Sequence, residues 1–192
     1  MYTAQNFKHL LGLECFSDKA LETHFTLYEG YVANTNKLLE ELSNLLKEDK
    51  TAAPQFAELK RRFSWEFDGM RLHELYFGSL VKGGVMLNAE SNLSQKITKD
   101  FGSFENWEKD FRATASMRGI GWAILFYDQK ADRLLNVWVN EHNSGHLAGA
   151  TPLLVCDVFE HAFIIDYGPK RAGYIDAFMK VVDWQSVSNR IK

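Results

Sequence analysis

The chain has 192 residues, of which 46% are apolar and 24% charged, with a formal net charge of −3. This length suits one domain or two small layers that share a core, and the slightly acidic balance excludes a polybasic nucleic-acid binder. Because no apolar run reaches about 18 residues, no export signal opens the chain and its two cysteines lie far apart, we expect a cytoplasmic protein with no membrane span.

Two long helices are predicted in the N-terminal half. Residues 17–50 carry apolar side chains at helical spacing, and Ser17 stands where a capping residue is expected. This apolar stripe consists of Leu21, Phe25, Tyr28, Val32, Leu39, Leu42 and Leu46. Pro54 suits the first turn of a second helix over residues 54–81, which a pair of glycines then ends. The short break between the helices predicts an antiparallel hairpin.

After about residue 85 the pattern changes to shorter elements. The sequence predicts helices at 91–100, 103–117, 172–179 and near Trp184, and buried strands at 122–127, 134–139 and 152–156. This order predicts an α+β fold. We expect an N-terminal α-hairpin domain over residues 1–84, and a domain over residues 85–192 in which helices surround a three-stranded antiparallel sheet.

Four residues in this frame are candidate ligands for one metal ion, held between the two predicted domains. His24 and His73 lie on the two arms of the hairpin, and Asp157 and His161 follow the third predicted strand. Three imidazoles and one carboxylate suit iron, manganese or zinc better than calcium or magnesium. Each residue alone has a simpler interpretation, because a lone histidine on such a helix face is most often a packed residue, and Asp157 could cap the next turn. His9 and His146 are expected at the surface.

The segment from Asp157 to Phe163 resembles a signature of the iron/manganese superoxide dismutases, Asp-x-Trp/Phe-Glu-His-Ala-aromatic. Segments 31–34, 101–104, 119–122 and 171–174 are similar to other motifs of that family, and the resemblance extends over about residues 20–190. It implies a superoxide dismutase that binds one iron or manganese ion per subunit. The ligands would be His24, His73, Asp157 and His161, with a solvent molecule as the fifth.

The resemblance also implies roles for residues around the metal. Tyr31 corresponds to a tyrosine of the substrate funnel, and Tyr76 and Trp122 correspond to aromatics packed around the ion. Without the resemblance, plain core packing would be the simpler interpretation of all three. Glu160 corresponds to a glutamate that reaches the partner subunit's His161, which implies a homodimer and leaves a tetramer open.

The family holds the metal-bound solvent with a glutamine from one of two positions, which in this chain are Gly69 and His142. Some members have histidine at the second position, so we expect His142 to bond this solvent and, with Tyr31, to be catalytic. A neutral imidazole nitrogen can donate or accept a hydrogen bond, but cannot do both. The alternative for His142 is a loop residue that faces water, and the choice between iron and manganese stays open.

The chain departs from the family at the entrance to the site. Tyr31 follows His24 by seven residues instead of eight, which at about 3.6 residues per turn still brings both to one helix face. A gateway histidine is missing, as is the partner tyrosine with which it pairs, whose position is Ile164. The substrate is an anion, so Lys170 and Arg171 are the candidates to steer superoxide locally toward the site.

Two other functions are weighed beside dismutation. The altered entrance favours a non-catalytic, dismutase-like metal-binding or structural subunit, although four retained ligands argue against it. An iron oxygenase with two histidines and one carboxylate is the other alternative. A fourth protein ligand argues against that chemistry, because it needs open positions on the metal. No role is assigned to Cys156.

Overall fold

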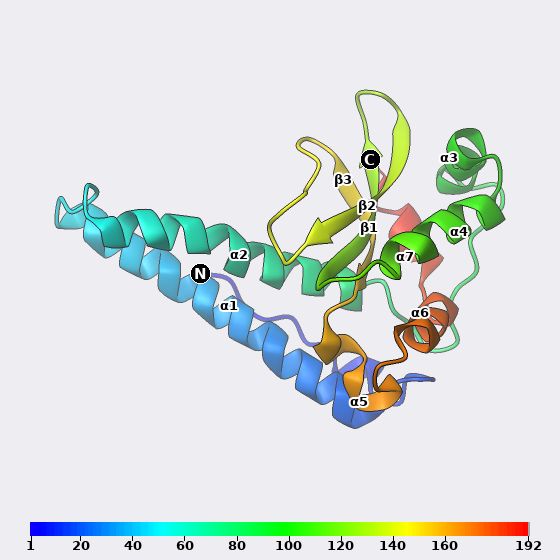
Figure 1. Ribbon diagram of the computed structural model, residues 1–192, viewed down its shortest axis with the longest axis horizontal. Coiled ribbons are helices and arrows are strands. Elements are labelled where there is room, and N and C mark those ends of the chain that lie inside the picture. Colours follow the sequence, from blue (N-terminus) through cyan, green and yellow to red (C-terminus); the bar gives the residue numbers. More distant parts are fainter. Residues whose placement is uncertain (192) are drawn as a thin grey trace.

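Two long antiparallel helices form one half of the structure, a computed structural model that describes residues 1–191 (Figure 1). They are α1 (Asp18–Lys47) and α2 (Pro54–Phe77), and their connection projects away from the rest of the molecule. The hydroxyl of Ser17 accepts a hydrogen bond from the backbone N–H of Ala20, which confirms the expected helix cap. The predicted hairpin is therefore confirmed.

The buried face of α1 differs from the predicted stripe in its second half. Leu39 and Leu46 are 39% and 63% exposed, so their predicted burial is wrong, and Leu38 and Leu45 are buried instead. Buried positions 35, 38, 42 and 45 alternate steps of three and four residues, the spacing of two helices that cross at a small angle. An offset of one residue turns a side chain about 100° away from that seam.

α2 ends at Phe77 rather than at residue 81. The guanidinium of Arg190, far along the chain, donates to the carbonyl of Leu75 at 3.0 Å and also to the carbonyl of Leu153. A charged side chain therefore satisfies a carbonyl in the last turn of α2 and ties it to the sheet. Beyond the helix, isolated β-bridges join Leu80 to Val182 and Val85 to Asp183.

The remaining elements confirm the predicted α+β class. They are α3 (Asn92–Phe101), α4 (Phe104–Ala115), β1 (Gly121–Asp128), β2 (Arg133–Asn140), β3 (Thr151–Asp157), α5 (Ile164–Tyr167), α6 (Arg171–Lys180) and α7 (Trp184–Ser188), with 3-10 turns at Lys8–Leu10 and Glu160–Ala162. The strands form one antiparallel sheet in the order β2-β1-β3. Its register sets Trp122 on β1 opposite Asp157 on β3.

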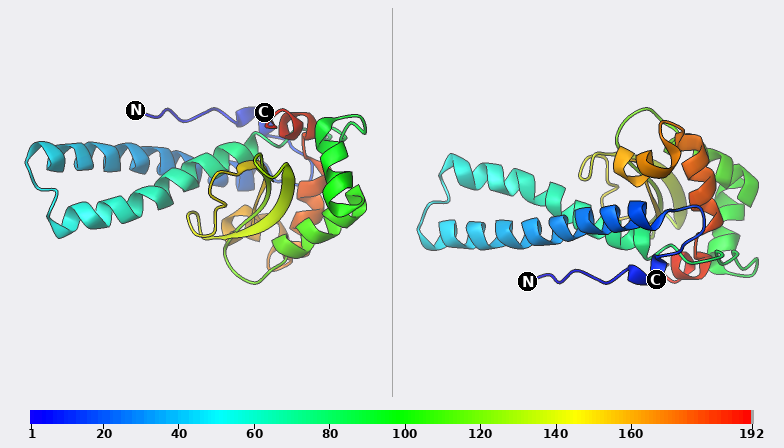
Figure 2. Two further views of the ribbon diagram at one scale, coloured as in Figure 1. Left: turned by 90° about the horizontal axis from the view of Figure 1, so that it is seen from above. Right: turned by 90° about the horizontal axis from the view of Figure 1, so that it is seen from below.

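The sheet lies between the base of the hairpin and the helices of the C-terminal half, as Figure 2 shows from above and below. The segment before α1 packs onto this core through Phe7, Leu10, Leu13 and Phe16, which recur at every third residue and were not predicted. No helix among residues 1–191 is long and apolar enough to cross a membrane. The core therefore spans both halves of the chain, and the candidate site lies where they meet.

Candidate metal centre

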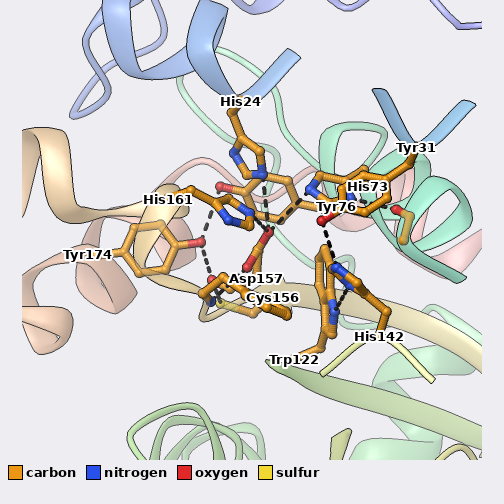
Figure 3. A network of polar contacts seen from close by, with 12 residues as sticks. His24, Tyr31, His73, Tyr76, Trp122, His142, Cys156, Asp157, His161 and Tyr174 are labelled. Carbon is orange, nitrogen blue, oxygen red and sulfur yellow. Dashed lines mark hydrogen bonds and ion pairs between the residues drawn. The ribbon is translucent and has the colours of Figure 1, made fainter. Parts of the chain in front are cut away.

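Four side chains converge where the base of the hairpin meets the end of β3 (Figure 3). His24 comes from α1, His73 from α2, Asp157 from the end of β3 and His161 from the following 3-10 turn. One potential ligand atom of each lies within 4.8 Å of the others. The Nε2 atoms of His24 and His161 are each 3.1 Å from Oδ2 of Asp157, and that of His73 is 3.6 Å away. The structure thus brings together the four residues selected by spacing.

Burial and mutual contact set the charges of this cluster. Burial lowers the pKa of His24 and lowers that of His73 well below its ordinary value, so both imidazoles are neutral at pH 7. Burial alone would raise the pKa of Asp157, but the contacts with His161 and His24 outweigh it and hold that pKa well below its usual range. The site therefore combines two neutral imidazoles with an ionised carboxylate, whereas contact with Asp157 outweighs burial and raises the pKa of His161, which must lose its proton to bind a metal.

His73 carries the strongest indication of a cation. Its Nδ1–H donates to the carbonyl of Gly69, because a carbonyl oxygen can only accept. Nε2 of this neutral ring is therefore unprotonated, and it is buried without a hydrogen-bond partner among residues 1–191. Its lone pair faces the Asp157 carboxylate at 3.6 Å, an arrangement of two acceptors that is unfavourable unless a positive charge lies between them. An iron or manganese ion fits this donor set.

A second group of side chains forms a directional chain of hydrogen bonds beside the cluster (Figure 3). The indole N–H of Trp122 donates to Nδ1 of His142 at 3.1 Å, and Nε2 of His142 is 2.8 Å from the hydroxyl of Tyr31. Burial lowers the pKa of His142 to about 4, so the ring is neutral at pH 7. Because an indole only donates, the ring proton must be on Nε2 and is donated to Tyr31. The alternative in which His142 faces water is wrong, since this residue is fully buried.

Because the Tyr31 hydroxyl oxygen accepts the hydrogen bond from His142, its own proton is free to be donated to another acceptor. Burial raises the pKa of that hydroxyl, so it is protonated at neutral pH. The Tyr31 ring stacks on His73 with a centroid distance of 5.1 Å and an interplanar angle of 28°. The spacing of seven residues between His24 and Tyr31 therefore does bring both side chains to the rim of the same site.

Gly69 makes room for this tyrosine. Trp65, Gly69 and His73 are four residues apart on α2 and share one face, and the Tyr31 ring covers the place of the missing side chain. A Cβ at Gly69 would lie 2.7 Å from Cδ1 of Tyr31. A glutamine at this position is therefore incompatible with the observed Tyr31 ring.

We expect Gly69→Ala to destabilise the protein by about 1–2 kcal/mol, because the new methyl group must displace the ring of Tyr31. Gly30→Ala is the matched control, since Gly30 lies in α1 with no atom within 4 Å of the added Cβ. That exchange should stabilise the helix by about 0.5–1 kcal/mol. Urea unfolding of both variants measures the difference, and equal effects at the two positions would contradict the packing described.

The other side of the cluster is closed by tyrosines. The hydroxyl of Tyr174 donates to the backbone carbonyl of Asp157 at 2.6 Å and lies 3.2 Å from the hydroxyl of Tyr76. Tyr76 also packs on His24 with centroids 5.3 Å apart. Burial raises the pKa of the Cys156 thiol, so it stays protonated, and it does not belong to the ligand group.

The remaining predicted residues do not belong to the ligand group. Glu160 is exposed beside His161. Arg171 donates to the carbonyls of Met117 at 2.6 Å and Gly119 at 2.8 Å, so its guanidinium is bound at the surface rather than free. His146, expected at the surface, is half-buried, and Nε2 donates to the carbonyl of His142.

Two contributors to the site were missed by sequence reasoning, Tyr174 and Trp65. Tyr174 lies in a segment noted for its motif, but nothing in the motif reveals that the hydroxyl reaches the carbonyl of Asp157. Trp65 packs on His142 and Tyr31 with centroid distances of 4.4 and 5.5 Å. Its place eight residues before His73, on the same helix face, is a signal that could have identified it.

Comparisons with known proteins show the family of this chain. Residues 89–190 match the profile of the iron/manganese superoxide dismutases, C-terminal domain. An iron superoxide dismutase of Aquifex pyrophilus is 39% identical over 186 residues, which cover 94% of this chain and 86% of that protein. An iron superoxide dismutase of Cupriavidus metallidurans is 38% identical over an alignment that covers 91% of this chain and 87% of that protein. A manganese superoxide dismutase of Halobacterium salinarum is 36% identical over an alignment that covers 88% of this chain and 82% of that protein.

Proposed function

Because this chain belongs to the iron/manganese superoxide dismutase family, we propose that it converts two superoxide anions and two protons to oxygen and hydrogen peroxide at the cluster around Asp157. The observation that carries this assignment to the cluster is the buried, unprotonated Nε2 of His73 opposite the Asp157 carboxylate. A bound iron or manganese ion supplies the one-electron redox couple for both halves of this reaction.

We propose that His24, His73, Asp157 and His161 hold the ion. When the imidazoles bind the ion in their neutral form, the four ligands add a single negative charge, and His24, His73 and Asp157 are buried in the surrounding core. Tyr76 and Tyr174 support the ligands from one side, and Tyr174 fixes the backbone of Asp157 through its carbonyl. Such outer contacts orient ligands and tune the bound metal.

Tyr31 and His142 are proposed to handle the protons. The reduction of superoxide to peroxide requires two protons, and the Tyr31 hydroxyl presents one that His142 does not use. His142 cannot take up a proton on Nδ1 without losing the bond from Trp122. We therefore expect His142 to orient the Tyr31 hydroxyl and, through its Nε2–H, to stabilise the oxygen when Tyr31 gives up its own proton, instead of acting as an independent base.

The stoichiometry of the reaction tests the proposed function. Purified protein supplied with a known amount of superoxide should form one oxygen and one peroxide for every two superoxide anions consumed. Peroxide formed without oxygen would indicate a reductase that needs an external electron donor, and would contradict dismutation. A protein that leaves superoxide at its spontaneous rate of decay would support a structural subunit instead.

We propose that the active form is a homodimer in which Glu160 of each subunit bridges to the partner subunit's His161. In support, Glu160 is exposed and lies on a surface hollow of about 710 Å³ together with Ile120 and Ile164, each 45% exposed. A carboxylate beside exposed apolar side chains is typical of a surface that pairs with another subunit.

We expect Ile164→Asp to weaken dimerisation by at least about tenfold, because it places a charge among the apolar side chains of this hollow. Glu160→Ala should also weaken dimerisation, because it removes the proposed bridge to the partner subunit's His161. Met86→Asp is the control, since Met86 is 92% exposed and lies outside the hollow. Sedimentation velocity across a dilution series measures the effect, and dissociation constants unchanged by Ile164→Asp and Glu160→Ala would contradict the proposed interface.

We propose that Arg171, with Lys170, supplies the local positive charge that steers superoxide. Arg171→Gln should lower the second-order rate severalfold at low ionic strength, and the difference should shrink at high salt because screening removes steering. Since Arg171 also binds two carbonyls, Lys170→Gln is the cleaner variant for the charge alone. A rate and salt dependence equal to wild type in both variants would show that steering arises elsewhere.

Two broader proposals accompany this function. Residues 1–84 and 85–192 are proposed as two domains with the metal between them, supported by the origin of the ligands, two from α1 and α2, one from the end of β3 and one from the 3-10 turn that follows it. The cytoplasm is proposed as the place of action, on the basis of the sequence alone.

A further inference from the structure

The turn that carries His142 is attached to one face of α2. This turn follows β2, and its backbone closes on itself through bonds from the N–H of Asn140 to the carbonyl of Ser144 at 2.7 Å and in the reverse direction at 3.2 Å. The backbone of Glu141, at the start of the turn, has a φ of +52°, a conformation that side-chain-bearing residues adopt only when their surroundings enforce it.

Three side-chain contacts attach this closed turn to α2. The indole N–H of Trp65 donates to the Glu141 carboxylate at 3.0 Å, and the side-chain amide of Asn143 donates to the hydroxyl of Ser64 at 2.9 Å. His146 donates to the carbonyl of His142 at 2.8 Å and lies 3.7 Å from the carboxylate of Asp68 on α2. The contacts therefore lie on both sides of His142 in the sequence.

Trp65 on α2 touches both the turn and the site. The edge of its ring meets His142 at a centroid distance of 4.4 Å and an interplanar angle of 73°, and it also packs on Tyr31. The Arg62 guanidinium covers the ring at 3.9 Å. The indole is thus restrained by a carboxylate at its nitrogen and by a cation at its face.

We propose that Trp65 and Glu141 are positioning residues that hold the His142 imidazole in the orientation that donates to Tyr31, an inference that rests on the proposed function. The turn closes through its own backbone, so the indole–carboxylate bond is not needed to form it. That bond instead determines where the closed turn lies relative to α2. Since α2 also carries His73, the same helix fixes the positions of the proposed ligand His73 and of His142 relative to each other.

The test is Trp65→Phe, which keeps an aromatic ring against His142 and removes the N–H that binds Glu141. We expect turnover to fall roughly tenfold, as is usual when an outer contact of a metal site is lost, while metal content and unfolding midpoint stay near wild type. Trp138→Phe is the matched control, because Trp138 is a half-buried tryptophan on β2 that makes none of these contacts with the turn. Loss of metal or of folding in parallel with activity would overturn the positioning role.

A spectroscopic readout separates position from stability. In protein loaded with diamagnetic Zn²⁺ and labelled with ¹⁵N-histidine, His142 should show one tautomer, protonated on Nε2, in the wild type. Trp65→Phe should give a mixture of tautomers, and an unchanged His142 spectrum would overturn the proposal. Assignment follows from the signal lost in His142→Gln.

A conservative pair at Glu141 completes the test. Glu141→Ala should reproduce the effect of Trp65→Phe, whereas Glu141→Gln keeps an oxygen acceptor for the indole and should restore both turnover and the single tautomer. Equal behaviour of the alanine and glutamine variants would contradict the role of the bond. If the wild type itself does not dismute superoxide, the proposed function fails, and the His142 spectra still decide whether Trp65 positions this ring.

Discussion

Purified His73→Ala protein is expected to hold almost no iron or manganese and to show no dismutation above the spontaneous rate. The substitution removes one of three imidazoles from a cluster whose atoms lie within 4.8 Å of one another. Because the His73 ring is completely buried, a solvent-exposed side chain cannot reach its position and replace it as a ligand. Elemental analysis and a superoxide assay on the same samples measure both effects.

His9→Ala is the control for this experiment, since His9 is exposed and outside the cluster. Circular dichroism should show that His73→Ala retains its helices, because loss of a buried side chain costs about 2–5 kcal/mol and can otherwise unfold the chain. A folded His73→Ala protein that keeps both metal and activity would remove His73 from the centre.

His142→Ala is expected to keep its metal and to lose about 100-fold in turnover. Neither ring nitrogen of His142 belongs to the ligand group, because one accepts from Trp122 and the other faces Tyr31. Proton transfer by a positioned side chain contributes about 100- to 10,000-fold to a rate, and its loss should appear in the step that requires protons. Metal content, steady-state turnover and its pH dependence together measure the result.

His142→Gln provides the matched comparison. A glutamine amide can accept from the Trp122 indole through its oxygen and donate to Tyr31 through its nitrogen, so this variant should retain more activity than alanine. Full activity in His142→Ala would exclude His142 from the proton path. Loss of metal from both variants would show instead that the ring is needed to assemble the ligands.

The four proposed ligands could be selected from the sequence because their signals are local. His24 and His73 lie within long periodic helices, and Asp157 and His161 are four residues apart after a buried strand. Periodicity identifies such elements and their order, and the break at Pro54 indicates that the two helices return antiparallel. The α+β class and the three strands follow from the same reasoning.

Contacts between distant residues could not be predicted in this way. The bond between Trp65 and Glu141 joins residues 76 positions apart, and the cap that Arg190 gives to Leu75 joins residues 115 apart. No periodic pattern marks such polar pairs, because they depend on how the elements pack. The resemblance singles out the position of Gly69, but the close approach of the Tyr31 ring to it appears only in the structure.

One iron or manganese ion, held around Asp157, is expected to carry the dismutation. The most direct test of this expectation measures metal content and dismutation rate on the same preparations of wild-type protein, stripped of metal and then loaded stepwise with iron or with manganese. Activity should rise in proportion to the metal bound, with at least one of the two ions, and should saturate near one ion per chain. A protein that binds one iron or manganese ion per chain and consumes no superoxide with either would contradict this expectation.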